Sequence, residues 1–248
     1  MRSPIFSVLH ATFGRPGKAM SAMEKFRVSC SDPSCVEYIF ACNDNDATVP
    51  ELMRLREQLY TNNQNIVHFA RLIVITGKFQ GSAAAWDGAA KVSAGHVLIQ
   101  GQDDIEPPPA WDVALTKAII NGIAEPRWET VPFFVAVSDG YRKDALCCTA
   151  IMSRPYMEQE GHFLCPEYIS VFSDDEVTYR ALRNQRDQTA FFVDARQIVF
   201  RHRHHYHDKT VPFDDTYSRE NSAHAYAVGE KLFRARNPRA ATDGLKTW

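Results

Sequence analysis

The stretch Val97-Leu98-Ile99-Gln100-Gly101-Gln102-Asp103-Asp104 decides the fold class, because a short apolar strand runs directly into paired acids. Ligands of open α/β sheets bind outside the carboxyl ends of the strands. Carboxylates placed there can hold a hard divalent cation, and the cation can hold phosphates. The triple proline at 107–109 closes the turn and favours this interpretation over a solvated acidic loop. The stretch therefore predicts a metal and phosphate site at the edge of a sheet.

Strand-like and helix-like segments alternate on both sides of this stretch. Strands are predicted by the apolar runs at 5–11, 36–42, 69–76, 130–137 and 191–200. Helices are predicted at 18–30, 49–62, 81–94, 111–122, 174–186 and 222–234. Residues 155–172 are aromatic and irregular. The alternation indicates an α/β fold, in which helices flank a mostly parallel central sheet.

The composition is that of an ordinary globular chain, with 248 residues, 45% hydrophobic and 23% charged. These values exclude a disordered or collagen-like protein. The net charge of −2 hides an asymmetry: residues 1–179 hold 15 Lys and Arg against 22 acids, and the rest of the chain holds 13 against 8. Such a split suggests a partner or ligand with a polarity of its own.

The cellular location follows from two absences in the sequence. No segment reaches the roughly 18 apolar residues of a membrane helix, so we expect no membrane insertion. Six cysteines without a CxxC pair are too few for a disulfide scaffold, and a zinc cluster is not expected. We expect reduced thiols in a cytoplasmic protein.

Two further strand ends carry polar groups. Asn43-Asp44-Asn45-Asp46 follows the strand at 36–42, where it is either a turn or helix cap or a contact to the base or ribose of a nucleotide. Thr12 to Arg15 follows the first strand. The planar guanidinium of Arg15 suits phosphate, although the glycine and proline beside it could simply shape the turn.

Two clusters in the second half of the chain could carry chemistry. His202, His204, His205 and His207 follow a strand, and alternation sends His202 and His204 to one side of an extended chain. Two imidazoles so spaced can approach one metal ion, whereas the plain alternative is an exposed basic loop. Asp174-Asp175-Glu176 is explained by a helix N-terminus alone, but one of these acids could serve as a general base.

Six aromatic residues lie outside an obvious core periodicity. We expect most of them in the core and two or three on a platform for a sugar or base. They are Trp111, Trp128, Tyr141, Tyr156, Phe163 and Tyr168.

In this order, the motifs resemble a family-2-type glycosyltransferase with the GT-A (Rossmann-like) fold, and most closely its short, phage-type members. The similar pieces are SVLHATFGRP, the strand ending in CNDND, the small-residue helix with Trp86-Asp87, IQGQDD, FSDDE and VFRHRHHYH with PFDDTY. The resemblance covers roughly residues 5–221. Each motif is loose, and only the ordered set is specific.

The resemblance implies a role for each candidate residue. Thr12, Arg15, Asp44 or Asp46, Trp86, Gln102 and Asp103 would bind the nucleotide-sugar donor. Asp104, with His202 or His204, would bind Mn²⁺ or Mg²⁺, and Asp103 could share that role. Asp175, or Asp174 one residue earlier, would be the catalytic base. Gln102 departs from the family pattern, which has an acid at that position.

The implied activity is transfer of a sugar, such as glucose from UDP-glucose, to an acceptor hydroxyl with inversion. Two kinds of acceptor stay open: a hydroxymethylpyrimidine of phage DNA, or a saccharide, lipid-linked carrier or protein. If a phage encodes the enzyme, we expect it in the host cytoplasm. Two rivals remain: a nucleotidyltransferase and a non-enzymatic nucleic-acid-binding module. The oligomeric state is left open.

The triple proline at 107–109 marks the boundary between two parts of a single 1–248 domain. Residues 1–106 would bind the nucleotide sugar, and residues 107–225 would form a smaller acceptor-binding and catalytic part. Residues 226–248 would complete the last helix and the tail.

Overall fold

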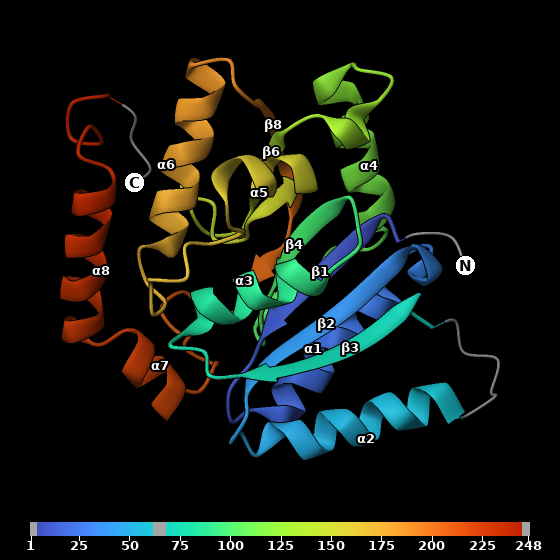
Figure 1. Ribbon diagram of the computed structural model, residues 1–248. Helices are drawn as coiled ribbons and strands as arrows, with labels where there is room; N and C mark the ends of the chain where they lie inside the picture. The colour runs from blue at the N-terminus through green and yellow to red at the C-terminus, as the bar shows by residue number, and fades with distance from the viewer. Residues whose placement is uncertain (1–3, 62–67, 245–248) are drawn as a thin grey trace.

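The computed structural model describes residues 4–61 and 68–244 and confirms the predicted fold class. A seven-stranded sheet has the order β3-β2-β1-β4-β7-β6-β8, and a two-stranded sheet pairs β5 with β9. Helices cover both faces of the large sheet (Figure 1). Only β7 runs antiparallel to its neighbours in the large sheet.

The elements follow one another in a largely alternating order. The strands are β1 Phe6–Ala11, β2 Val36–Asn43, β3 Arg71–Gly77, β4 Val97–Gly101, β5 Ile105–Glu106, β6 Phe133–Ser138, β7 Ile151–Ser153, β8 Phe191–Val199 and β9 Arg201–His202. The helices are α1 Pro16–Val28, α2 Thr48–Thr61, α3 Ser82–Val92, α4 Trp111–Ile123, α5 Arg154–Glu160, α6 Ser173–Arg186, α7 Asp215–Glu220 and α8 Ala223–Arg236. Two 3-10 turns lie at Pro33–Cys35 and Trp128–Thr130.

Side-chain alternation along the strands creates two hydrophobic layers. On β2, Tyr38 and Phe40 face the layer that holds α1, α2 and α4, whereas Ile39 and Ala41 face the layer that holds α3, α5 and α6. All four side chains are fully buried. Because this central strand is buried on both faces, its sequence is a continuous apolar run rather than an alternation of apolar and polar residues.

One prediction about local structure was wrong. Residues 155–172 were expected to be irregular, but α5 begins at Arg154, directly after β7. Ser153 caps this helix by accepting a hydrogen bond from the Tyr156 amide, and Pro155 stands in its first turn. The strand and helix are each too short for the hydrophobic period to reveal them.

The sheet continues across the predicted division at residue 106, because β4 pairs with β7. The division into donor and acceptor parts stays a prediction. The helix predicted at 49–62 corresponds to α2, which ends at Thr61. Residue 62 lies outside the described residues. In the described ranges, no helix combines the length and apolarity needed to cross a membrane.

Candidate active site

A cavity of about 800 Å³ lies where β1, β2 and β4 end, as open α/β sheets predict. The structure brings nine of the twelve predicted site residues into its lining. They are Thr12, Arg15, Trp86, Gln102, Asp103, Asp104, Asp174, His202 and His204. Asp44, Asp46 and Asp175 lie outside that lining.

Asp103 is held from inside the protein. His10 is fully buried, and its Nε2 donates to Asp103 Oδ1 at 2.9 Å, while its Nδ1 lies 2.6 Å from the hydroxyl of buried Tyr38. The other oxygen of Asp103 accepts from Thr12 Oγ1 at 3.3 Å and lies 3.8 Å from Arg15 Nη1. Both oxygens of Asp103 are therefore engaged, and this acid orients the first loop.

Asp104 points the other way, toward the C-terminal segment. Its Oδ1 lies 3.4 Å from His202 Nε2, and its Oδ2 accepts a short hydrogen bond from the Tyr217 hydroxyl. Burial opposes ionisation of Asp104, but His202 and the Tyr217 hydrogen bond outweigh it and hold its pKa below the usual range. Asp104 is therefore an ionised carboxylate.

A small antiparallel ladder positions the histidines. Ile105 in β5 pairs with His202 in β9, and the Arg203 amide donates to the Asp104 carbonyl at 2.8 Å. Although burial lowers the pKa of His202, Asp104 raises it above the ordinary value. Burial and the neighbouring His202 lower the pKa of His204 to about 4, so His204 is neutral at pH 7.

The donor set suits a divalent ion that is shared with a ligand. In the described part of the chain, no group of three or more His, Cys, Asp or Glu side chains is arranged to hold a metal alone. Mg²⁺ and similar ions in phosphate sites often use one or two carboxylates together with substrate phosphates. Asp104 supplies the one carboxylate of that pattern, and the imidazoles of His202 and His204, with ring centres 5.1 Å apart, add nitrogen donors beside it.

Arg15 is bound by acids on two sides. Beyond Asp103, its Nη2 donates a short hydrogen bond to Asp214, which also accepts from Lys18 Nζ at 2.9 Å. The guanidinium carbon lies 4.9 Å from the centre of the Tyr217 ring. Asp214 caps α7 through the Tyr217 amide, so α7 lies against the first loop. Anions would compete with Asp214 for the two cations.

The acids after β2 lie apart from the cavity. Asp46 is buried and accepts hydrogen bonds from the amides of Gly14, at 3.0 and 3.1 Å, and Thr48, at 2.8 Å. Asp46 therefore connects the turn after β1, in which Gly14 has a φ of +66°, to the start of α2. Asp44 is exposed. Their predicted donor contacts stay predictions, and Asn43 and Asn45 line the cavity instead.

Two other predicted donor residues are fixed by backbone contacts. The Trp86 indole Nε1 donates to the Gly101 carbonyl at 2.8 Å, which ties α3 to the end of β4. Gln102 Nε2 donates to the Cys148 carbonyl at 3.1 Å, so Gln102 braces the loop before β7. Both contacts leave these side chains on the cavity wall.

Asp174 and Asp175 open α6 on the far side of the cavity, and only Asp174 lines it. Burial raises the pKa of Asp174, and burial and the Asp174 charge raise the pKa of Asp175 to about 7. The two acids titrate as a pair. An acid with its pKa near neutrality can accept a proton efficiently.

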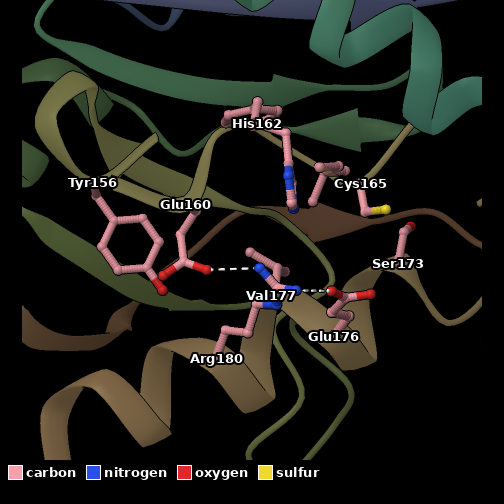
Figure 2. A pocket seen from close by; sticks show the side chains of 10 residues that line it. Tyr156, Glu160, His162, Cys165, Ser173, Glu176, Val177 and Arg180 are labelled. Atoms are coloured by element: carbon pink, nitrogen blue, oxygen red, sulfur yellow. Dashed lines mark hydrogen bonds and ion pairs between the residues drawn. The ribbon is translucent and has the colours of Figure 1, made fainter. Parts of the chain in front are cut away.

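The first turns of α6 are anchored from the side opposite the cavity. Figure 2 shows Arg180 between Glu160 and Glu176, at 2.8 and 2.7 Å. Glu176 also accepts from Arg236 in α8, at 3.1 Å. Glu176 is nearly inaccessible, so it is a structural acid and leaves Asp174 to face the cavity.

Sequence reasoning missed several residues of this site. Asp214, Tyr217 and Glu220 come from α7 and its cap, a helix of six residues that gives no periodic signal. Burial, which Arg15 only partly offsets, raises the pKa of the cavity-lining Glu220 to about 7. The PFDDTY motif marked the segment, but nothing in it predicted contacts to Asp104 and Arg15.

The expected aromatic platform was also misplaced. None of its six candidate residues lines the cavity. Trp111, Tyr156, Phe163 and Tyr168 are fully buried, because they fill the layers between helices and sheet. The exposed Phe and Tyr rings in the cavity lining are those of Phe13, Tyr206 and Tyr226.

Comparison with known proteins identifies the fold. No protein-family model and no curated protein sequence matches the chain. S. aureus TarS matches with a TM-score of 0.63 at 12% identity, over 98% of this chain and 40% of that chain. The mannosyltransferase PcManGT from Pyrobaculum calidifontis, in complex with GDP-Man and Mn²⁺, matches with a TM-score of 0.56 at 14% identity, over 99% and 77%.

A shorter TarS structure in complex with UDP-GlcNAc has a TM-score of 0.56 at 12% identity, over 96% of this chain and 74% of that chain. The chain thus has the GT-A fold of solved glycosyltransferases and spans about two fifths of the first TarS structure.

Proposed function

We propose that this chain is a metal-dependent glycosyltransferase that moves a sugar from a nucleotide-sugar donor to an acceptor hydroxyl. One observation carries the proposal: ionised Asp104, paired with His202, shares a single cavity with Asp174 at the carboxyl ends of the strands. The fold adds support, because similar structures are complexes with UDP-GlcNAc and with GDP-Man and Mn²⁺.

The donor diphosphate would lie between the first loop and the histidine segment. Asp104, with His202 and His204, would hold Mn²⁺ or Mg²⁺, which when bound neutralises charge on the leaving diphosphate. Arg15 and Lys18 would contact the phosphates once Asp214 gives way. A guanidinium suits phosphate because its donors form a planar fork.

The chemical step needs one proton acceptor from the protein. Asp174 takes the proton from the acceptor hydroxyl, whose oxygen forms a bond to the anomeric carbon of the donor sugar. The bond from that carbon to the diphosphate oxygen breaks, and the nucleoside diphosphate leaves with the bonding electrons. A base opposite the leaving group gives inversion, which the family resemblance also favours.

The finer assignments rest on the sequence resemblance. UDP-glucose is the proposed donor, and the acceptors that the resemblance offers are hydroxymethylpyrimidine in phage DNA and a saccharide, lipid-linked carrier or protein. Six free thiols fit a reducing cytoplasm. The proposed division of labour keeps residues 1–106 for the donor and residues 107–225 for the acceptor.

A thermal-shift screen of nucleotide sugars, with and without Mn²⁺, tests the proposal. We expect one donor to raise Tm only in the presence of the metal, and the same mixture to release nucleoside diphosphate slowly. Release of pyrophosphate from a nucleoside triphosphate, with no response to any nucleotide sugar, would instead identify a nucleotidyltransferase. Nucleic-acid binding that survives Asp104→Ala, without donor response, would identify a binding module.

A further inference from the structure

Two tyrosine rings stand half-exposed in the wall of the cavity. Tyr206 is 52% exposed and Tyr226 is 45% exposed, and both line the cavity. Each ring is backed by another ring: Tyr206 stacks on His204 at 5.2 Å, and Tyr226 meets Phe172 edge-on at 6.2 Å. Backing fixes the orientation of an aromatic ring while leaving surface free for a ligand.

The packing of α8 brings Tyr226 to the cavity. Gly229 lies one turn after Tyr226, and a Cβ there would meet the Val171 carbonyl oxygen at 2.7 Å. The glycine therefore lets α8 approach the loop before α6 closely. This close approach places the Tyr226 ring beside Phe172, directly before the start of α6.

Tyr226 lies near Asp174, because its ring contacts Phe172 directly before α6, whereas Tyr206 lies beside it on the histidine segment. Burial, followed by the charges of neighbouring Tyr206, Asp174 and Asp175, raises the pKa of Tyr226. The cavity lining also holds polar residues from the same segments: Ser170, His207, Asn221, Ser222 and His224. Such a wall offers ring faces and hydrogen-bonding groups to a ligand next to the proposed base.

The charges of the cavity do not suit a polyanionic acceptor. Its lining holds three arginines (Arg15, Arg142 and Arg219) against four acids (Asp103, Asp104, Asp174 and Glu220). Arg142 is held by Asp144 through two hydrogen bonds, at 3.0 and 2.6 Å. Arg219 lies over the Phe13 ring, 4.6 Å from its centre.

The basic excess of the C-terminal part is mostly used elsewhere. Six of its arginines form ion pairs with acids: Arg180, Arg186, Arg196, Arg203, Arg234 and Arg236. Of the Lys and Arg that the structure describes from residue 180 onward, Arg219 alone lines the cavity. Nucleic-acid sites need several cations along the backbone.

We infer that Tyr206 and Tyr226 form the acceptor subsite, and that its ligand is a saccharide. The apolar C–H face of a sugar ring lies on the tyrosines, and a hydroxyl of that ring reaches Asp174. Lys209 Nζ lies 5.4 Å from the centre of the Tyr206 ring, and this exposed side chain would move aside or join the ligand. The inference rests on the proposed function for the identity of the reaction, but binding can be measured without turnover.

Saturation-transfer NMR of the full chain with a panel of defined mono- and oligosaccharides tests the subsite directly. We expect at least one saccharide to bind through its ring C–H protons. Tyr226→Ala and Tyr206→Ala should each weaken it about tenfold, the scale of one lost stacking contact. Tyr226→Phe should keep the affinity. Val228→Ala, an exposed position on the same helix outside the cavity lining, is the matched control.

Two results would overturn the inference. One is that no saccharide in the panel binds, or that the bound one is indifferent to both alanine variants. The other is that a duplex oligonucleotide carrying hydroxymethylcytosine binds in the cavity and becomes glycosylated while the saccharides do not. Tyrosine-dependent saccharide binding without donor consumption would support the subsite and count against the proposed function alone.

Discussion

Asp103 and Asp104 are adjacent in the chain, yet their carboxylates serve different parts of the molecule. Asp103 is engaged by His10, Thr12 and Arg15, whereas Asp104 faces His202 and Tyr217. Successive side chains of an extended segment point in opposite directions. Only Asp104 therefore faces the groups that would share a metal ion with a diphosphate.

The first prediction separates these two acids. Asp104→Asn should abolish the Mn²⁺-dependent part of donor binding while the protein still unfolds in one cooperative transition. Asp103→Asn should lower the free energy of unfolding, by about 3 kcal/mol at most, because buried His10 loses its carboxylate partner. Calorimetric titration with the donor, with and without Mn²⁺, and urea denaturation measure the two effects. Metal-dependent binding by Asp104→Asn would contradict the assignment.

The second prediction concerns the pH dependence of transfer. Burial raises the pKa of Asp174, the proposed base, and burial with the Asp174 charge raises the pKa of Asp175 to about 7. Because Asp174 accepts a proton only when it is ionised, we expect kcat/KM to rise with pH as this acid loses its proton. Asp175→Asn should shift this rise to lower pH, because Asp174 loses a like-charged neighbour. Asp174→Asn should lower kcat by roughly 10²–10⁴-fold.

The same pair makes stability depend on pH, and the sign is opposite to that of activity. A carboxyl whose pKa is raised in the folded state stabilises the fold fully below its unfolded pKa, and this contribution is lost as the pH rises through about 7. Asp175→Asn should therefore be more stable than the wild type at pH 8. Urea denaturation at pH 5 and pH 8 measures the free energies of unfolding of both proteins. The same difference between variant and wild type at both pH values would contradict this prediction.

At the scale of elements, α7 occupies the groups that the donor would need. Its cap, Asp214, neutralises Arg15 and Lys18. Asn caps a helix as well as Asp does, so Asp214→Asn keeps α7 while removing the competing charge. The third prediction is that this variant binds the nucleotide sugar about two- to tenfold more tightly. Asp215→Asn, an exposed neighbour outside these contacts, is the control. Unchanged or weaker donor binding by Asp214→Asn would rule out competition.

The anchoring of α6 leads to the fourth prediction. Glu176 joins Arg180 and Arg236, so Glu176→Gln leaves two partly buried cations with weaker partners. We expect a loss of stability on the order of 3 kcal/mol, and a fall in kcat because Asp174 begins the same helix. The dissociation constant of the donor should stay the same. Glu230→Gln, which disturbs an exposed pair on α8, should change neither quantity.

Several elements of the first half of the chain were predictable because their residues alone give a clear pattern. The apolar strand predicted at 97–100 and the small-residue helix predicted at 81–94 correspond to β4 and α3. By contrast, β7, α5 and α7 have three, seven and six residues, and long-range pairing decides their place. The partners of Asp103 and Asp104 were equally hidden, since His10 and Tyr217 lie 93 and 113 residues away in the chain.

At the scale of the whole molecule, the split between an acidic front and a basic back does not become a basic face at the site. Four C-terminal arginines pair with acids on α5, α6, α8 and β8 that lie outside the cavity lining: Arg180, Arg196, Arg234 and Arg236. Figure 1 shows α6 and α8 side by side, and the acid Glu176 of α6 binds Arg236 of α8. The positive charge thus stabilises the docking of elements.

The fifth prediction follows from this distribution of charge. Acceptor binding should depend only weakly on salt, because the cavity wall offers few free cations to a backbone of phosphates. At saturating donor, raising the salt from about 50 to 200 mM should change the KM for a saccharide acceptor less than about fourfold, the effect of a single phosphate contact. An acceptor held by six to ten phosphate contacts would lose about 10³–10⁵-fold in affinity over the same range. Initial rates at several salt concentrations distinguish the two. A steep rise of the acceptor KM with salt would indicate that the basic C-terminal part binds a phosphate-bearing acceptor.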